Sequence, residues 1–205
     1  MTARRHLVIF AKAPAIGRVK RRLAAEIGEV EALRFYRATL ARLVGRLGRD
    51  RRWSARLALS PDRAARDGAL GFGGTVVPQG GGDLGARMGR AIAGCPPGPA
   101  VLIGADIPDV APAHVARAFA ALRGHDVVFG PATDGGFWLV GASAAGRRRL
   151  AFAEGIRWSS AHALADTRAG LPTGTGVAVA DTLADVDDAA AHARWRALYK
   201  PRAQT

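Results

Sequence analysis

Short apolar runs alternate with amphipathic segments from one end of this chain to the other. Each apolar run is bounded by Gly, Pro, Asp or Ser, which is typical of buried strands. In the intervening segments the apolar residues recur at helical spacing, most clearly over 30–47. Strands that alternate with helices predict an α/β fold in which helices cover a central sheet.

The same pattern sets the expected order of elements. We expect strands over 7–10, 55–60, 75–79, 101–105, 126–130, 137–141 and 176–180, and helices ending near 27 and over 30–47, 84–93, 112–123, 160–169 and 188–199. Only six residues separate 126–130 from 137–141, whereas a parallel crossover needs a dozen or more. The sequence therefore predicts a three-layer α/β/α sandwich with a mixed, mostly parallel sheet. No repeat or change in composition marks a linker, so residues 1–205 are expected to form one domain.

The net charge of +13 is unevenly placed along the chain. Residues 1–56 hold 15 of the 30 Lys and Arg but only 4 of the 17 Asp and Glu. The arginines along 34–56 are interleaved with apolar residues, which indicates the solvated face of an amphipathic helix. The alternative is a nucleic-acid binder that uses an Arg-rich helix over 29–56. No recognition motif supports it and the aromatic content is only 6%, so no nucleic-acid partner is expected.

Two features bear on where the chain works. No apolar run is long enough to span a bilayer, and the first residues lead into a strand without a signal-peptide pattern. Cys95 is alone, which excludes an intrachain disulfide. We expect a cytoplasmic protein with no membrane span, and we predict no oligomeric state.

Asp106 ends the most informative of the apolar runs, at the point where a turn begins. Ligands of open α/β sheets gather beyond the carboxyl ends of the strands, where a carboxylate is well placed to hold a divalent cation. The local sequence allows two other interpretations: Asp106 caps the helix that begins near Pro112, or its side chain orders the turn.

The loop after the first strand carries Lys12, Arg18, Lys20 and Arg22, with Gly17 among them, and leads into a helix. Cations and the free N–H groups of a helix start favour phosphate. The spacing matches neither the Walker loop nor the dinucleotide-binding glycine pattern, so a merely basic turn is the alternative.

Two glycine-rich loops and one acidic run complete the candidate site. The loop over 79–88 includes Gly80 and Arg87, and its glycines allow a ligand to approach the backbone closely. The loop over 130–138 includes Asp134, for which a simple turn is the competing interpretation. The acidic run over 181–188 either begins the last helix or brings Asp187 into the pocket.

Taken together, these segments resemble one bacterial family. It is a glycosyltransferase-like family, in part linked to arsenosugar biosynthesis, among the nucleotide-diphospho-sugar transferases of GT-A fold. The resemblance runs in order through 10–23, 83–88, 103–109, 130–137, 155–160, 166–167 and 183–188. Arg21 departs from the pattern, because the family usually has Thr after the lysine. A more distant likeness is to guanylyltransferases of the same fold.

The resemblance implies a nucleotide over the first loop and Mg²⁺ (or Mn²⁺) on Asp106, with Asp187 or Asp134 as a second metal or acceptor contact. Lys12, Gly17, Arg18 and Lys20 are then expected to bind the phosphates, with Gly80 and Arg87 beside them.

The expected activity is glycosyl transfer from a nucleotide-sugar to a small-molecule acceptor, with Asp106, Asp134 and Lys20 as catalytic residues and Asp134 as the base. Nucleotidyl transfer from an NTP to a phosphorylated small molecule, with release of pyrophosphate, is the alternative.

Overall fold

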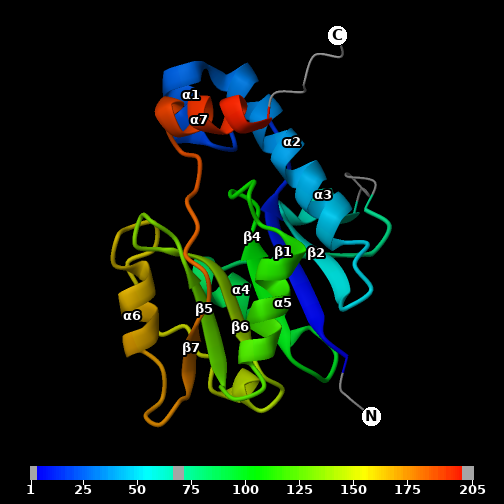
Figure 1. The fold of residues 1–205 in the computed structure, drawn as a ribbon, viewed down its shortest axis with the longest axis vertical. Coiled ribbons are helices and arrows are strands. Elements are labelled where there is room, and N and C mark those ends of the chain that lie inside the picture. Colours follow the sequence, from blue (N-terminus) through cyan, green and yellow to red (C-terminus); the bar gives the residue numbers. More distant parts are fainter. Residues whose placement is uncertain (1–3, 67–71, 200–205) are drawn as a thin grey trace.

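A seven-stranded sheet forms the middle layer of the computed structural model, which describes residues 4–66 and 72–199 (Figure 1). Its strands are β1 (His6–Lys12), β2 (Ser54–Ser60), β3 (Thr75–Pro78), β4 (Ala100–Gly104), β5 (Val127–Pro131), β6 (Phe137–Ala142) and β7 (Val177–Val179). They are arranged in the order β3-β2-β1-β4-β6-β5-β7.

All neighbouring strands are parallel except where β6 is involved, since β6 is antiparallel to both β4 and β5. The connection between β5 and β6 is too short for a crossover, so the chain turns back and inserts β6 between β4 and β5. The prediction of a mixed, mostly parallel sheet is confirmed.

Helices surround the sheet. They are α1 (Arg21–Ile27), α2 (Glu29–Leu47), α3 (Asp62–Arg66), α4 (Leu84–Ala93), α5 (Pro112–Ala121), α6 (Ala163–Ala169) and α7 (Ala189–Tyr199), together with a short 3₁₀ turn, η1 (Gly146–Arg148).

The alternation of side chains in β1 explains the layers. Leu7 and Ile9 belong to a core that includes buried residues of α2 and α5, such as Leu40 and Phe119. Val8 points the other way, into a core formed with α4 and packed against by α6. Both faces of the sheet are therefore covered, and the predicted three-layer sandwich is confirmed.

Within residues 4–66 and 72–199, no helix has the length and hydrophobicity of a transmembrane span.

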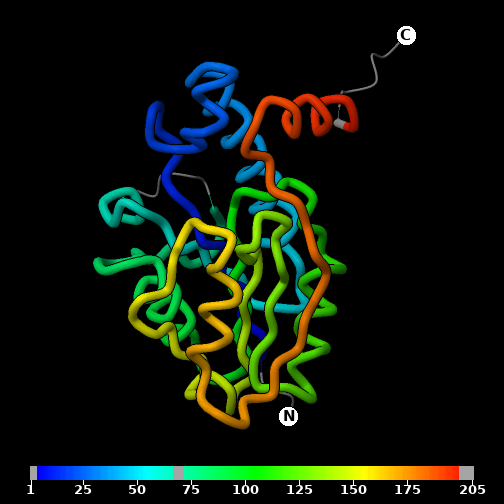
Figure 2. Tube along the Cα trace, turned by 90° about the vertical axis from the view of Figure 1, so that its left-hand side faces the viewer, coloured from blue at the N-terminus to red at the C-terminus, as the bar shows by residue number. Residues whose placement is uncertain are grey.

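A third cluster joins α1, α2 and α7 beyond the end of the sheet. Leu23, Phe35 and Val186 form its buried centre, and Trp195 packs against it. Figure 1 shows α1 and α7 together above the strands, and Figure 2 shows the segment after β7 running alongside the sheet to reach α7. Helices from the first and the last quarter of the sequence therefore pack together at this end of the molecule.

Several predicted boundaries were wrong. The Arg-rich helix does not extend to residue 56: α2 ends at Leu47, and the chain turns to enter β2 at Ser54. The apolar spacing already stops at Leu47, and Trp53 returns to the core, where its indole donates to the Leu47 carbonyl at 2.8 Å. The short helix α3 and the turn η1 were missed because neither is long enough to show a helical period. That residues 1–205 make one domain stays a prediction.

Candidate functional site

The loops that carry the candidate residues lie at one edge of the sheet. Because β1, β3, β4 and β5 run in the same direction, their carboxyl ends point to the same side. The segment after β7 also starts at this edge, since β7 is parallel to β5. The expected meeting of the four loops is confirmed, and the acidic run joins them.

Strand register places Lys12 and Asp106 at the same edge of the sheet. Phe10 of β1 pairs with Gly104 of β4, so Lys12 and Asp106 each lie two residues beyond a paired position on adjacent parallel strands. The Asp106 side chain is 60% exposed. Of the alternatives for Asp106, the helix cap is wrong, because the residue that precedes α5 is Ala111. No backbone N–H within 4–66 or 72–199 donates to the Asp106 carboxylate, so the turn does not use it either.

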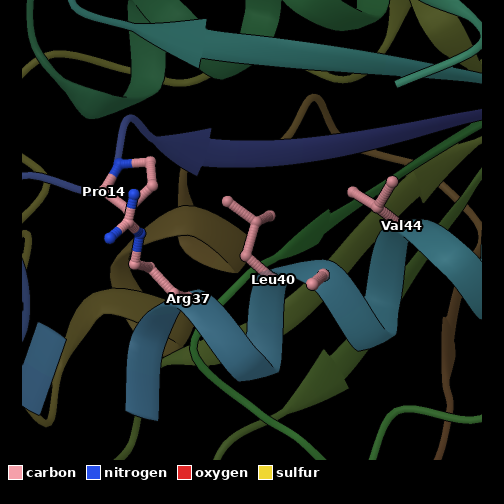
Figure 3. Close-up of a pocket in the computed structure, with 5 residues that line it drawn as sticks. Pro14, Arg37, Leu40 and Val44 are labelled. Atoms are coloured by element: carbon pink, nitrogen blue, oxygen red, sulfur yellow. The ribbon is translucent and has the colours of Figure 1, made fainter. Parts of the chain in front are cut away.

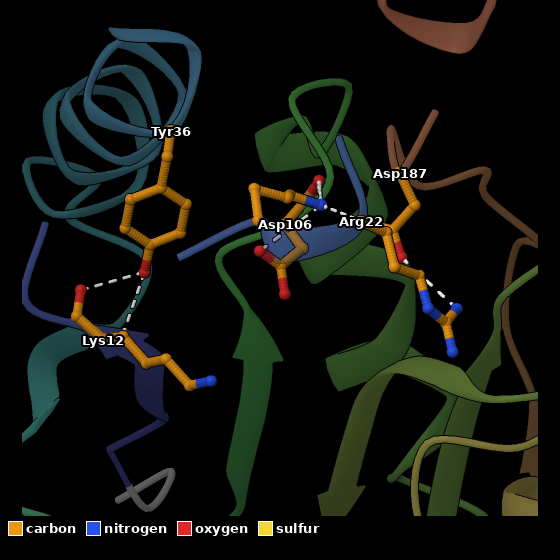
Figure 4. A network of polar contacts seen from close by, with 6 residues as sticks. Lys12, Arg22, Tyr36, Asp106 and Asp187 are labelled. Carbon is orange, nitrogen blue, oxygen red and sulfur yellow. Dashed lines mark hydrogen bonds and ion pairs between the residues drawn. The ribbon is translucent and has the colours of Figure 1, made fainter. Parts of the chain in front are cut away.

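Lys20 joins the first loop to both candidate metal ligands, Asp106 and Asp187, which are labelled in Figure 4. Its Nζ lies 2.7 Å from Oδ1 of Asp187 and 3.5 Å from Oδ1 of Asp106. It also lies 3.4 Å from the Asp106 backbone oxygen. One ammonium is therefore shared by residues from the β4 loop and from the segment before α7.

The local fold forces Lys20 inward. Its backbone is left-handed, with φ 46° and ψ 49°, and it immediately precedes α1. Val19 on one side and Leu23 on the other are buried in different core clusters. These anchors fix the chain direction at Lys20, and the side chain is only 3% exposed. A left-handed non-glycine residue costs about 1–3 kcal/mol and persists only where its surroundings determine it.

A second register match brings the acidic run to the site. Ala132 forms a parallel bridge with Leu183, so Asp134 and Asp185 each lie two residues past that bridge. Burial, a hydrogen bond with Asp187 and the charge of that residue raise the pKa of Asp185 to about 6, against the effect of Lys20. Burial alone would raise the pKa of Asp187, but the charge and hydrogen bond of Lys20 outweigh it and lower that pKa.

The other aspartates of the acidic run have different partners and different roles. Asp188 accepts a hydrogen bond from the Ala191 N–H at 2.6 Å and so begins α7, as one interpretation expected. Asp187 points to Lys20, as the other expected. Asp181 instead pairs with Arg117, 2.9 Å away.

Tyr36 of α2 holds the end of β1. Its hydroxyl donates to the Lys12 carbonyl and accepts from the Lys12 N–H, each at 2.9 Å (Figure 4). Burial, together with the negative charge of Asp106, raises the pKa of the Tyr36 phenol. The hydroxyl is thus neutral and fixes the backbone from which the Lys12 side chain extends. Sequence reasoning missed this residue, because a tyrosine at helical spacing is usually part of a core.

A buried glutamine holds the strand ends on the other side of β1. The Gln79 side-chain amide donates to the carbonyls of Ala11 (2.8 Å) and Ala58 (2.9 Å). Arg87 donates to its side-chain oxygen, and the Arg87 guanidinium lies 5.6 Å from the centre of the Phe10 ring. Arg87 is therefore held at the edge of the sheet by a residue that sequence reasoning did not single out.

The glycine-rich loop is more structural than the sequence suggested. The Gly80 N–H donates to Asp62 of α3 at 3.0 Å, and a Cβ at Gly80 would come within 2.5 Å of the Arg90 guanidinium. Glycine is required there by its φ of 75° and by this close approach. Ligand binding at Gly80 stays a prediction.

Asp134 also has a local role, since its carboxylate accepts from the Gly136 N–H at 2.9 Å. This hydrogen bond is the one that the turn interpretation of Asp134 expects. Asp134 still lies at the same edge of the sheet as Asp185. Gly17 adopts φ 68°, and Arg18 is exposed next to it. The phosphate-binding roles of Gly17, Arg18 and Lys12 stay predictions.

An aromatic side chain faces the glycine-rich loop from the other half of the chain. The Trp158 indole donates to Asp83 at 3.2 Å, and Asp83 also caps α4 by accepting from the Ala86 N–H at 2.8 Å. Phe137 and Phe152 lie near the Trp158 ring, with centroids 6.3 and 6.0 Å away. Only the likeness of residues 155–160 to the resembled family could have pointed to this contact.

The donor set fits a hard divalent cation. Asp106 and Asp187 offer carboxylate oxygens that already share one positive group, the Lys20 ammonium. Mg²⁺ is usually held by one or two carboxylates together with substrate phosphates, and the two that contact Lys20 are Asp106 and Asp187. No group of three or more His, Cys, Asp or Glu with metal-binding geometry occurs within residues 4–66 and 72–199.

A hollow of about 210 Å³ lies beside α2, lined by Pro14, Arg37, Leu40, Ala41 and Val44 (Figure 3). Its lining is mainly apolar, and none of the candidate site residues belongs to it. It is therefore separate from the cluster around Lys20.

Comparison with known proteins places the chain in a family. The profile described as "Uncharacterized protein conserved in bacteria (DUF2064)" matches residues 42–160. The chain belongs to this family. No curated protein sequence matches it.

Solved structures show how widely the fold of this DUF2064 protein is shared. A "putative nucleotide-diphospho-sugar transferase" from Desulfovibrio desulfuricans G20 is 28% identical, with a TM-score of 0.80 over 97% of this chain and 89% of that one. A CMP:2-keto-3-deoxy-manno-octonic acid synthetase complexed with CTP is 13% identical, with a TM-score of 0.61 over 96% of this chain and 98% of that one. A manganese complex of Rv0371C from Mycobacterium tuberculosis H37Rv is 21% identical, with a TM-score of 0.53 over 95% and 98%. The last two show the fold alone.

Proposed function

We propose that this protein is a metal-dependent transferase that uses a nucleotide-activated donor, and that it transfers a glycosyl group from a nucleotide-sugar to a small-molecule acceptor. The observation that carries the proposal is the convergence of Lys20, Asp106 and Asp187, from three distant parts of the chain, at the carboxyl edge of the sheet. Two carboxylates and a cationic loop at one edge are what a metal-bound diphosphate requires.

The relatives support the same class of reaction. The 28% identical structure carries a name of the nucleotide-diphospho-sugar transferase class, over nearly the full length of both chains. The motif resemblance to glycosyltransferase-like proteins linked to arsenosugar biosynthesis supports the glycosyl form of the proposal.

In this proposal Asp106 and Asp187 hold Mg²⁺ or Mn²⁺, which when bound offsets the negative charge that develops on the leaving diphosphate. Lys12, Arg18 and Lys20 bind the phosphates, with the backbone of Gly17 giving the loop its turn. Tyr36 holds the main chain of Lys12, and Gln79 holds the Arg87 guanidinium, so the backbone at Lys12 and one cation are fixed before the substrate arrives.

Asp134 is the proposed base for the acceptor hydroxyl. Its hydrogen bond to Gly136 fixes the carboxylate at the carboxyl edge, on the segment that runs beside Asp185. The acceptor then enters on the β5 side of the edge, opposite the phosphate loop. A cytoplasmic location, based on the single unpaired cysteine, is part of the same proposal.

Nucleotidyl transfer is the second candidate. It is favoured by the four cations of the first loop, which suit a triphosphate, and it would use the same carboxylates. In that reaction a phosphorylated acceptor attacks the α-phosphorus of an NTP and pyrophosphate leaves.

Product analysis separates the two reactions. The protein is incubated with Mg²⁺ and either a panel of nucleotide-sugars or a panel of NTPs, together with a pool of small hydroxylated and phosphorylated acceptors. The proposal expects a nucleoside diphosphate as the released product and binding of the intact nucleotide-sugar. Release of pyrophosphate from one NTP, without turnover of any nucleotide-sugar, would establish the second candidate instead. Absence of binding to either panel would refute both.

A further inference from the structure

Lys20 already occupies the position of a cation at the candidate site. Its ammonium lies within 3.5 Å of one carboxylate oxygen on each of two aspartates, and within 3.4 Å of a backbone oxygen. The contacts with Asp187 and with the Asp106 backbone oxygen are hydrogen bonds, and the contact with the Asp106 carboxylate is an ion pair. The side chain is 3% exposed, whereas lysine is almost never fully buried unless it is paired.

The two carboxylates come from segments that lie far apart in the sequence. Asp106 follows β4, and Asp187 precedes α7. Without a positive group between them, they would repel each other at the partly buried position of Asp187, which is 36% exposed. Lys20 removes that repulsion, and it links the cluster of α1, α2 and α7 to the edge of the sheet.

A divalent cation held by the same two carboxylates would compete with this ammonium. Two positive groups within a few ångströms repel each other, and the 3% exposure of the Lys20 side chain limits how far solvent weakens that repulsion. The Lys20 ammonium would have to leave, and a buried ammonium without an anionic partner is costly. The phosphates of a nucleotide would supply the new partner.

We propose that Lys20 is a built-in cation that holds Asp106 and Asp187 together until the metal arrives with its nucleotide, and that it thereby makes metal binding depend on the nucleotide. This inference rests on the proposed function, since it assumes that the same two carboxylates bind the metal. When metal and nucleotide bind together, the Lys20 ammonium passes from the carboxylates to the phosphates. Metal alone must displace the ammonium without offering it a partner.

Arg22 provides a matched control. It also carries a positive charge toward Asp187, with Nη1 4.0 Å from Oδ2, but its side chain is 73% exposed. Solvent screens such a contact, so its removal has little effect on a cation at Asp187. A comparison of Lys20 and Arg22 substitutions therefore separates two effects. One is that of the buried ammonium shared by both aspartates, and the other is that of positive charge near Asp187.

The test is Mn²⁺ binding followed by electron paramagnetic resonance, in which bound Mn²⁺ is measured as loss of the free-ion signal. It compares wild type, Lys20→Met, Lys20→Gln and Arg22→Met, each with and without a saturating nucleoside diphosphate. Circular dichroism and thermal melting confirm that each variant is folded. The Gln variant keeps a hydrogen-bond donor for Asp187 if the Met variant folds poorly.

In the absence of nucleotide, Lys20→Met and Lys20→Gln should bind Mn²⁺ about tenfold more tightly than wild type, within the usual range of coupling between two sites. Their ratio of affinities with and without nucleotide should fall by a similar factor, and in the absence of nucleotide Arg22→Met should stay within about twofold of wild type. Equal nucleotide-free affinity in wild type and both Lys20 variants would overturn the inference while leaving the proposed function intact. If wild type binds no Mn²⁺ even with nucleotide, the metal part of the proposed function fails, and the inference fails with it.

Discussion

The double hydrogen bond from Tyr36 to Lys12 should contribute measurably to stability. In Tyr36→Phe the Lys12 N–H and carbonyl both lose their partner, at a position where the tyrosine is only 3% exposed. Each hydrogen bond contributes about 1 kcal/mol net, and a buried group left unsatisfied costs about 1–3 kcal/mol. We expect Tyr36→Phe to lower the free energy of unfolding by about 2 kcal/mol. For a chain of this length that corresponds to a fall in Tm of roughly 4–8 °C.

Thr39, one helical turn further along α2, supplies the control. Its side chain is 1% exposed, and its hydroxyl has no hydrogen-bond partner within the described ranges. Thr39→Val removes a hydroxyl of the same helix but breaks no bond, so stability should be unchanged or higher. Urea unfolding followed by tryptophan fluorescence measures both variants. A loss below about 0.5 kcal/mol in Tyr36→Phe, or an equal loss in Thr39→Val, would refute the account of how β1 ends.

Two further predictions concern buried polar side chains. Gln79→Glu should destabilise the protein by about 3 kcal/mol in urea unfolding, because a carboxylate cannot donate to the carbonyls of Ala11 and Ala58; an unchanged urea midpoint would contradict this. Burial lowers the pKa of His192, with Arg196 acting in the same direction and Glu31 opposing, and burial also lowers the pKa of His6. Since these folded-state pKa values lie below the ordinary value of about 6.5, stability should be complete above that pH and fall as the pH drops through it. Asp185, whose pKa is raised to about 6, gains a proton over the same range and opposes the fall, so the test is the difference between wild type and His192→Phe. Urea midpoints from pH 7.5 to 5.5 should fall less in the variant than in wild type, and an identical slope would count against this assignment.

The sequence predicted the fold well because its elements carry their own periodicity. The six-residue gap before Phe137 predicted the mixed sheet, and the position of Asp106 after a buried strand predicted its place at the carboxyl edge. Parallel strands end at one edge whatever their order, so the four loops were expected to meet before the strand order was known.

The contacts within the site were less predictable, because they depend on distant parts of the chain. The first loop and the last acidic run both looked charged, but their meeting at Lys20 and Asp187 depends on the packing of α7 against α1. Likewise, the left-handed backbone of Lys20 is set by how Val19 and Leu23 are anchored, which no local rule specifies.

Buried polar residues were the hardest to assign from sequence. The sequence predicts that Gln79 is part of a glycine-rich loop, whereas its side chain holds the ends of two strands. Asp188 and Asp187 are adjacent and chemically identical, yet one begins a helix and the other reaches the site. Only the direction of the chain at α7 separates their roles.

The most direct measurement is the thermal shift produced by a nucleotide-sugar with and without Mn²⁺, compared between wild type, Asp106→Asn and Asp109→Asn. Ligand binding to the folded state raises Tm, so the extra shift that Mn²⁺ produces reports the metal bridge. Our account predicts that Asp106→Asn loses this extra shift but keeps the metal-independent part, and that Asp109→Asn, on the same turn, keeps both. An Mn²⁺-dependent shift of wild-type size in Asp106→Asn would contradict the assignment of Asp106 as a metal ligand.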